Sequence, residues 1–327
     1  MGNLFYYGKT PLNVSMSNID DSLESGVRTW SSQKISDTIN EINTTWHEAT
    51  NVKIGQCAEA GCNGVSIGSN AGAGSSAYTN TVAIGTSATV KASGAIAIGR
   101  NSVSAGINEI SIGVQSGSAA STGGHNIFIG YCSGFCNTTG CYNTFLGKAS
   151  GFCNTTGCFN IFLGDASGYC NTIGCCNTFL GDGSGYCNIT GCYNTFLGVA
   201  SGYSNTAGCC NTFLGVNSGY CNITGEDNVF IGNLSGRSNK AGCYNTFLGT
   251  KSGYSNTTGS YNIFLGRESG YFNTTGCYKV IVGDLQDVNG NADFALGHSG
   301  GNADNNYLFT CNNHLYWCHG AVLDTIK

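Results

Sequence analysis

The chain has 327 residues and a net charge of −5, and only 9% of its residues are charged, so it lacks the basic surface that nucleic-acid binding needs. Its 51 glycines with a single proline exclude collagen and proline-rich linkers, and 41% hydrophobic residues are too many for a disordered chain. No long apolar run occurs, so the sequence predicts no membrane insertion.

Residues 1–50 lie outside the repeats and form the first predicted domain, an attachment and trimerisation segment. Ser31 is a suitable helix N-cap, and Ile35, Ile39 and Ile42 then fall on one helical stripe. Isoleucine at such positions suits a three-stranded coiled coil. We therefore predict a short helix here, which either nucleates a trimer or caps the next domain alone.

The second predicted domain, residues 51–297, opens with short apolar segments that each end at glycine. Val82 to Gly85, Ile96 to Gly99 and Ile110 to Gly113 are examples, with glycines 14 residues apart. Alternating residues bounded by glycine are typical of short β-strands. Repetition at a fixed period is typical of a solenoid, in which each unit stacks on its neighbour.

From Asn126 onward the unit lengthens to 17 residues and recurs without an insertion as far as Lys279. The unit from Asn143 to Phe159 reads NTFLGKASGFCNTTGCF. We predict two strands in each coil, Asn143 to Leu146 and Ser150 to Cys153, separated by glycine and by the turn-forming Asn-Thr-Thr-Gly sequence. The predicted fold class is all-β, a parallel β-roll or β-solenoid of 14- and 17-residue repeats.

Both faces of the main strand are apolar. Side chains alternate across a strand, so Phe145 faces one way and Thr144 and Leu146 the other. A small coil has one interior, and exposed apolar ladders mark interfaces. We expect three copies to associate along the phenylalanine face as a homotrimer, unless a wider monomeric roll holds both faces inside. The predicted core and trimer-interface ladder is Phe128, Phe145, Phe162, Phe179, Phe196, Phe213, Phe230, Phe247 and Phe264.

Residues 298–327 form the third predicted domain. Tyr307 to Trp317 alternates in hydrophobicity and turns at Asn312 and Asn313, which predicts a β-hairpin. A solenoid needs a cap over its last layer. We expect this C-terminal hairpin to be that cap, or a distal tip that touches a receptor.

Three segments carry a resemblance to a known family. Asn80 to Gly85, Gly94 to Gly99 and Ile110 to Gly113, each followed by small residues, resemble the head repeats of trimeric autotransporter adhesins. The resemblance implies a left-handed parallel β-roll, three of which pack into an obligate trimer that binds host surfaces. The longer units are similar to repeats of viral and phage fibre-like proteins. With no signal peptide or anchor barrel recognisable, we expect a virion or another extracellular surface.

The 19 cysteines are typical of an oxidised compartment, and most fall in two columns, one before and one after the Asn-x-x-Gly turn. Disulfides across the turn, bridges between coils or chains, and free buried thiols are all compatible with the spacing. The candidate disulfide cysteines are Cys136 and Cys141, Cys153 and Cys158, Cys170 and Cys175, and Cys187 and Cys192.

No catalytic constellation accompanies the repeats. The 5 histidines have no fixed spacing to a nucleophile or an acid, and no cysteine spacing typical of zinc occurs. We therefore expect no enzyme, no metal and no cofactor. Asn-x-Thr triplets such as Asn154 to Thr156 are either glycosylation acceptors or plain turn residues, and we favour the turn.

The sequence thus predicts a structural or adhesive trimeric surface fibre. Its expected partners are its own copies and a host-surface glycan or protein. A passive spacer or scaffold of a particle is the alternative. An ice-binding solenoid is another alternative, because regular threonine columns on a β-solenoid can order water. It is the weaker one, because Ile127 and Ile161 interrupt the column that contains Thr144.

Overall fold

The structure is a computed structural model that describes residues 5–7, 10–12, 51–56, 58–60, 63–75, 77–117, 121–284, 294–298, 306–311, 314–319 and 322–326. Within these residues the chain is all-β and contains no helix. Strand β1 (Phe5–Tyr7) pairs antiparallel with β2 (Thr10–Leu12). The helix predicted around Ile35 lies outside the described residues.

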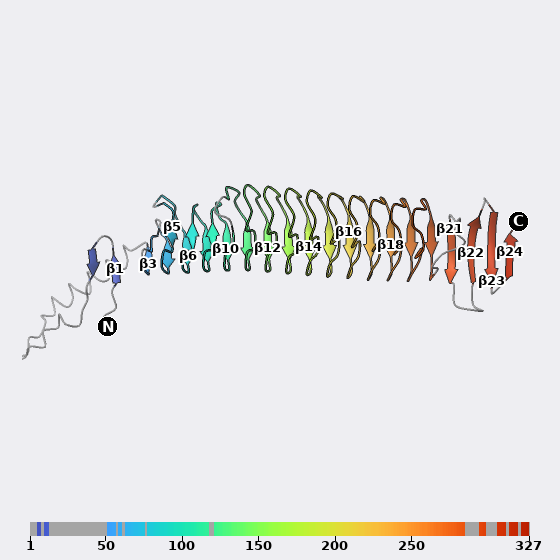
Figure 1. Cartoon of the computed structure of the whole chain (residues 1–327), viewed down its shortest axis with the longest axis horizontal. Coiled ribbons are helices and arrows are strands. Elements are labelled where there is room, and N and C mark those ends of the chain that lie inside the picture. The colour runs from blue at the N-terminus through green and yellow to red at the C-terminus, as the bar shows by residue number, and fades with distance from the viewer. Residues whose placement is uncertain are drawn as a thin grey trace, which may run out of the picture.

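One parallel ladder forms the body of a long rod (Figure 1). It begins with β3 (Val52–Ile54), β4 (Val65–Ile67), β6 (Val82–Ile84), β8 (Ile96–Ile98) and β10 (Ile110–Ile112). It continues with β11 (Ile127–Ile129), β12 (Thr144–Leu146), β13 (Ile161–Leu163), β14 (Thr178–Leu180), β15 (Thr195–Leu197), β16 (Thr212–Leu214), β17 (Val229–Ile231), β18 (Thr246–Leu248), β19 (Ile263–Leu265) and β20 (Val280–Val282). Neighbouring strands pair in register, so the fold is a parallel β-solenoid with a main repeat of 17 residues.

The interior of the rod widens along the chain. Ala83 and Ala97, paired across β6 and β8, occupy the central strand position of the first coils and are buried. Phe128 and Phe145 hold the same position in β11 and β12, where the paired residues are 17 apart. The longer coil therefore closes around an aromatic ring, whereas the shorter one closes around a methyl group.

Among the described residues, a second ladder is present only in the first coils. It consists of β5 (Gly72–Ala73), β7 (Thr89–Val90) and β9 (Val103–Ser104). The second strand predicted at Ser150 to Cys153 is wrong, because this segment of the longer coil is a turn. Its backbone nevertheless bonds to the next coil, as from Gly151 N to Ser167 O at 2.9 Å.

Two glycines in each long coil bend the chain tightly around the phenylalanine ring. Gly147 has φ 139°, and a Cβ there would collide with the carbonyl group of Gly164 in the next coil. Gly151 has φ 59°, and a Cβ there would collide with the ring of Phe145. Both φ values suit glycine, which has no Cβ. The bend explains why a β-strand does not form after Gly147.

Two columns of buried asparagines tie each coil to the next. In the first column, Asn160 donates from Nδ2 to Asn143 Oδ1 at 3.1 Å and from its backbone N to the same oxygen at 3.0 Å. In the second, Asn171 Nδ2 donates to Asn154 Oδ1 at 2.7 Å. All four side chains are 0% exposed. Because buried polar groups need hydrogen-bond partners, these columns specify the register of the coils.

The C-terminal end of the ladder becomes antiparallel. Strand β20 pairs parallel with β21 (Phe294–His298), and the antiparallel strands β22 (Asn306–Cys311), β23 (His314–His319) and β24 (Val322–Ile326) follow in order. The edge strands β3 and β24 therefore lie at opposite ends of this sheet (Figure 1).

The antiparallel strands cover the last coil of the solenoid. Strands β22 and β23 pair antiparallel with Cys311 opposite His314, which confirms the predicted β-hairpin between Tyr307 and Trp317. Ala295 of β21 is buried at the end of the phenylalanine column, and Tyr316 of β23 packs against the same cluster. The C-terminal strands thus close the hydrophobic core at this end.

Candidate functional site

The predicted phenylalanine ladder is the core of a single chain. All nine side chains from Phe128 to Phe264 are 0% exposed. The rings stack nearly parallel, with centroids 4.8 Å apart for Phe145 and Phe162. A ring buried inside its own chain leaves no surface for a second copy. The prediction that copies associate along this ladder is therefore wrong.

The apolar side chains on the other side of the strands remain at the surface. We call outer face the first and third residues of β11 to β19. Leu146 is 43% exposed and Ile161 is 44% exposed. The alternative of a wide roll that holds both apolar faces inside is therefore also wrong. The outer face consists of Ile127, Ile129, Thr144, Leu146, Ile161, Leu163, Thr178, Leu180, Thr195, Leu197, Thr212, Leu214, Val229, Ile231, Thr246, Leu248, Ile263 and Leu265, none of them charged.

The candidate disulfide cysteines are free thiols in the structure. The bridge predicted across the turn between Cys136 and Cys141 is not formed. Cys141 Sγ instead lies 3.1 Å from Cys158 Sγ of the next coil. Cys141 therefore faces Cys158 along the rod, whereas the thiols of the later coils donate to a carbonyl of their own turn, as from Cys158 Sγ to Thr156 O at 3.4 Å.

Sulfur also takes part in the bonds between coils. The backbone N of Cys141 donates to Cys158 Sγ at 3.1 Å, and that of Cys158 donates to Cys175 Sγ at 3.2 Å. Ser260 occupies the same position and accepts from Cys243 N at 3.0 Å. This position therefore uses a small side chain that accepts a hydrogen bond, and serine can replace cysteine there.

The surroundings of the thiols make them poor nucleophiles. The hydrogen bond with Cys158, followed by desolvation, raises the pKa of Cys141 to about 11. Desolvation raises the pKa of Cys170 and Cys187 in the column before the turn. Because the thiolate is the reactive form, these thiols react slowly at neutral pH.

The asparagines of the predicted glycosylation triplets point inward. Asn154, Asn188 and Asn222 are 0% exposed. Asn154 Nδ2 donates to Asn137 Oδ1 at 2.8 Å and to Gly157 O at 3.0 Å. A glycan on this nitrogen would break both bonds, so the turn interpretation holds for the folded chain.

An aromatic row follows the outside of the turns. The row has one residue in each coil, aromatic in every coil but one, where Arg237 takes the position. Its members are Phe135, Phe152, Tyr169, Tyr186, Tyr203, Tyr220, Arg237, Tyr254 and Tyr271. Tyr169 and Tyr186 stack with centroids 5.0 Å apart and an angle of 3° between the rings. The guanidinium carbon of Arg237 lies 5.4 Å from the ring centroid of Tyr220 and 5.8 Å from that of Tyr254, as in cation–π pairs.

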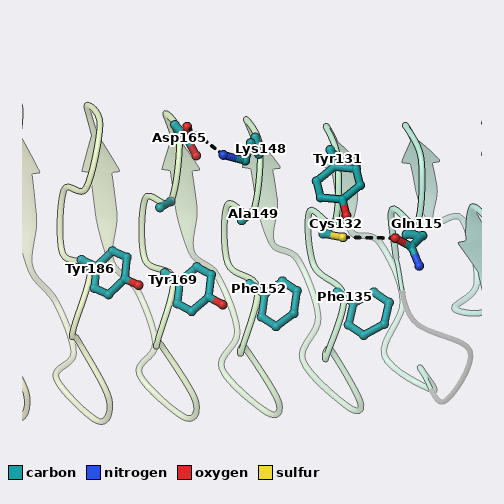
Figure 2. Close-up of a pocket in the computed structure, with 11 residues that line it drawn as sticks. Gln115, Tyr131, Cys132, Phe135, Lys148, Ala149, Phe152, Asp165, Tyr169 and Tyr186 are labelled. Carbon is teal, nitrogen blue, oxygen red and sulfur yellow. Dashed lines mark hydrogen bonds and ion pairs between the residues drawn. The ribbon is translucent and has the colours of Figure 1, made fainter.

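A groove of about 430 Å³ runs beside the N-terminal part of the aromatic row (Figure 2). Lys148 Nζ and Asp165 Oδ2, 3.6 Å apart, lie on the opposite wall. Cys132 Sγ, in the groove, donates to Gln115 Oε1 at a distance of 3.7 Å. The groove is lined by Gln115, Tyr131, Cys132, Phe135, Lys148, Ala149, Phe152, Asp165, Ala166, Tyr169 and Tyr186. It thus combines aromatic edges with polar and charged groups, as ligand sites do.

Sequence reasoning missed the aromatic row and the asparagine columns. Their signal is the same 17-residue spacing that revealed the phenylalanine ladder, because residues at this spacing must stack in a solenoid. A strand at Ser150 to Cys153 followed by a turn at Asn154 predicts no contacts between equivalent residues of neighbouring coils, such as those of Asn154 with Asn137 and of Phe152 with Tyr169.

The described residues offer no cluster of three or more His, Cys, Asp or Glu side chains that could hold a metal ion. In the same part of the chain, no helix has the length and apolar character to cross a membrane. Protein-family models searched with the sequence give no match, and neither do curated proteins.

Proposed function

We propose that this protein is a rigid rod of a homotrimeric surface fibre on a virion or another extracellular surface. The observation that carries the proposal is the outer face, an uncharged strip of half-exposed aliphatic and threonine side chains along nine successive strands, β11 to β19. Such a long apolar strip is typical of an interface. Its repetition lets three identical rods meet with the same contacts in every coil.

The interior supports a mechanical role. Stacked phenylalanines fill the core, and each coil is bonded to the next through buried asparagines such as Asn143 and Asn160. In a solenoid each unit contacts only its neighbours, so stiffness depends on these coil-to-coil interfaces. The ladder runs from β3 to β20 (Figure 1), which suits a shaft that holds a contact site away from its base.

The groove favours an adhesive rod over a passive spacer. A spacer has no use for exposed aromatic rings beside an ion pair, whereas a binding site for a glycan or protein of a host surface uses both kinds of group. Tyr169, Tyr186, Lys148 and Gln115 are the residues that we expect to contact such a receptor (Figure 2).

Light scattering of the purified full chain tests the assembly. One chain has a mass of 33.8 kDa, and we expect the mass of three chains. The double variant Leu180→Lys, Leu197→Lys should be monomeric with an unchanged β-sheet circular dichroism spectrum, because charges on the outer face would have to be buried. Ile173→Lys, on a turn where the side chain is 51% exposed, is the matched control and should remain trimeric. A monomeric wild-type protein would contradict the proposal.

Binding of the same sample to immobilised host-surface glycans and cells separates the adhesive rod from the spacer. The double variant Tyr169→Ala, Tyr186→Ala should not bind, while its assembly remains a trimer by light scattering. Absence of binding by the wild-type trimer would favour the spacer. Thermal hysteresis, measured in parallel, would identify an ice-binding rod.

A further inference from the structure

Five cysteines occupy the position after the Asn-x-x-Gly turn in five successive coils. This cysteine column consists of Cys141, Cys158, Cys175, Cys192 and Cys209. Each is partly exposed, so a small reagent can reach it from solvent. Glu226 takes the position in the following coil and ends the column.

The geometry between neighbouring coils suits a disulfide. Parallel layers lie about 4.8 Å apart, and a disulfide spans a Cα separation of about 4.4 to 6.8 Å. Cys141 Sγ and Cys158 Sγ are already 3.1 Å apart and hydrogen-bonded to each other. The Cys141 thiol therefore faces along the rod to the next coil, not across its own turn to Cys136.

We propose that the cysteine column is a disulfide site in which Cys141 bonds to Cys158 of the next coil. A column of five thiols in single file holds two bridges at most. The contact between Cys141 and Cys158 places the first bridge at the N-terminal end of the column, and the remaining three thiols can then form one more. The bridges join coil to coil within one chain and are independent of the trimer.

The co-reactant that we propose is a small-molecule disulfide such as oxidised glutathione. The Cys158 thiolate attacks one sulfur of this disulfide, which forms a mixed disulfide and releases one small thiolate. The Cys141 thiolate then attacks the Cys158 sulfur, which forms the bridge and releases the second small thiolate. The two cysteine thiols are oxidised, the small disulfide is reduced to two thiols, and the two protons from the cysteines end on them.

Serine variants are suitable probes because the position tolerates serine. Ser260 already accepts the N–H of Cys243 at 3.0 Å and donates to Thr258 O at 3.3 Å, as Cys158 does with Cys141 N and Thr156 O. Cys141→Ser should therefore fold with the hydrogen bonds of the coil preserved. Cys136→Ser, in the column before the turn, is the matched control.

The test is to treat the native full chain with oxidised glutathione, alkylate the remaining thiols, denature the protein and map it by tryptic mass spectrometry. Cleavage at Arg100, Lys148 and Arg237 separates Cys141 from the rest of the column. We expect a disulfide-linked pair of peptides, 101–148 with 149–237, that disappears on reduction and is absent from Cys141→Ser. It should persist in Cys136→Ser.

Three results would overturn the proposal. The peptide pair could persist in Cys141→Ser and vanish in Cys136→Ser, which would place the bridge in the other column. Glutathione adducts alone, without a peptide pair, would show that neighbouring thiols do not react with each other. A doubled mass in non-reducing electrophoresis would show that the bridges join chains. Each outcome is independent of whether the wild-type protein is a trimer by light scattering.

Discussion

In both asparagine columns, side-chain amides such as those of Asn160 and Asn171 donate to the asparagine of the preceding coil, so each column finishes at its N-terminal end on a donor that needs an acceptor. Glu109 provides it. Asn126 Nδ2 donates to the Glu109 carboxylate at 3.2 Å, and Asn137 Nδ2 reaches it through the hydroxyl of Ser121. At the other end, Lys279 replaces asparagine in the first column. Opposite charges at the two ends suit aligned amide dipoles, as they do at helix ends.

Glu109 predicts a pH dependence of stability. Its side chain is completely buried, and desolvation raises its pKa above 4.5, although hydrogen bonds from Asn126, Ala105 and Ser121 oppose the shift. The folded protein therefore holds the proton more tightly than the unfolded chain does. This contribution to the free energy of unfolding is fully present below pH 4.5 and is lost as the pH rises through the raised pKa.

Urea unfolding of the wild type and Glu109→Gln between pH 3.5 and 8 measures this effect. The free energy of unfolding of the wild type, relative to the variant, should fall with rising pH by about 1.4 kcal/mol for each unit of pKa shift. The other carboxyl groups titrate in both proteins and cancel in the difference. A difference that rises with pH would show that hydrogen bonds outweigh desolvation.

At the scale of the coil, the length of the repeat and the size of the buried side chain match. Coils near Ala83 enclose alanine, and coils from Phe128 onward enclose phenylalanine stacked on phenylalanine. In this arrangement each ring is packed from above and below by the neighbouring coils, which leaves little freedom for the core to relax around a smaller side chain.

Phe196→Ala should therefore lower the free energy of unfolding by about 3 to 5 kcal/mol. Tyr193→Ala is the control, because Tyr193 is an aromatic residue three positions before Phe196 but is 65% exposed. We expect the control to change stability by about 0.5 kcal/mol or less. Chemical denaturation followed by circular dichroism gives both values. Equal losses for the two variants would contradict the assignment of Phe196 to a tightly packed core.

At the scale of the whole molecule, the ends of a parallel ladder are its weak points. An uncovered last strand presents free N–H and C=O groups to any other chain. In this protein, β22 covers β21, and Tyr316 covers the end of the phenylalanine column. The antiparallel strands thus protect both the backbone edge and the hydrophobic core.

A chain truncated after His298 should form larger assemblies than the full chain does. It lacks β22, β23 and β24, so we expect species larger than the parent in size-exclusion chromatography, increasingly so at higher protein concentration. A chain that ends at His319 lacks only β24, keeps the cover over β21, and should elute like the parent. Identical elution of the two truncated chains would show that β22 and β23 have no protective role.

Several features of the fold follow from the order of residues. A 17-residue period without insertions predicts parallel, in-register coils, because only this arrangement gives every Phe145 equivalent the same surroundings. Alternation predicts that Phe145 and Leu146 face opposite ways, as they do. The asparagine pair at 312–313 predicts the C-terminal hairpin. The resemblance to adhesin repeats, and the trimer and receptor that it implies, stay predictions.

Other features depend on how the coil closes. Alternation cannot tell which apolar face is inside; that is decided by Gly147 and Gly151, whose positive φ values bend the chain around the ring of Phe145. Closure also turns the asparagines inward to form columns and directs Cys141 along the rod toward Cys158. The sequence by itself determined the period, the main strand of each coil and its register, because these depend on local propensity and repetition. Only the tertiary structure decided what is buried, since burial depends on the direction and radius of the bend.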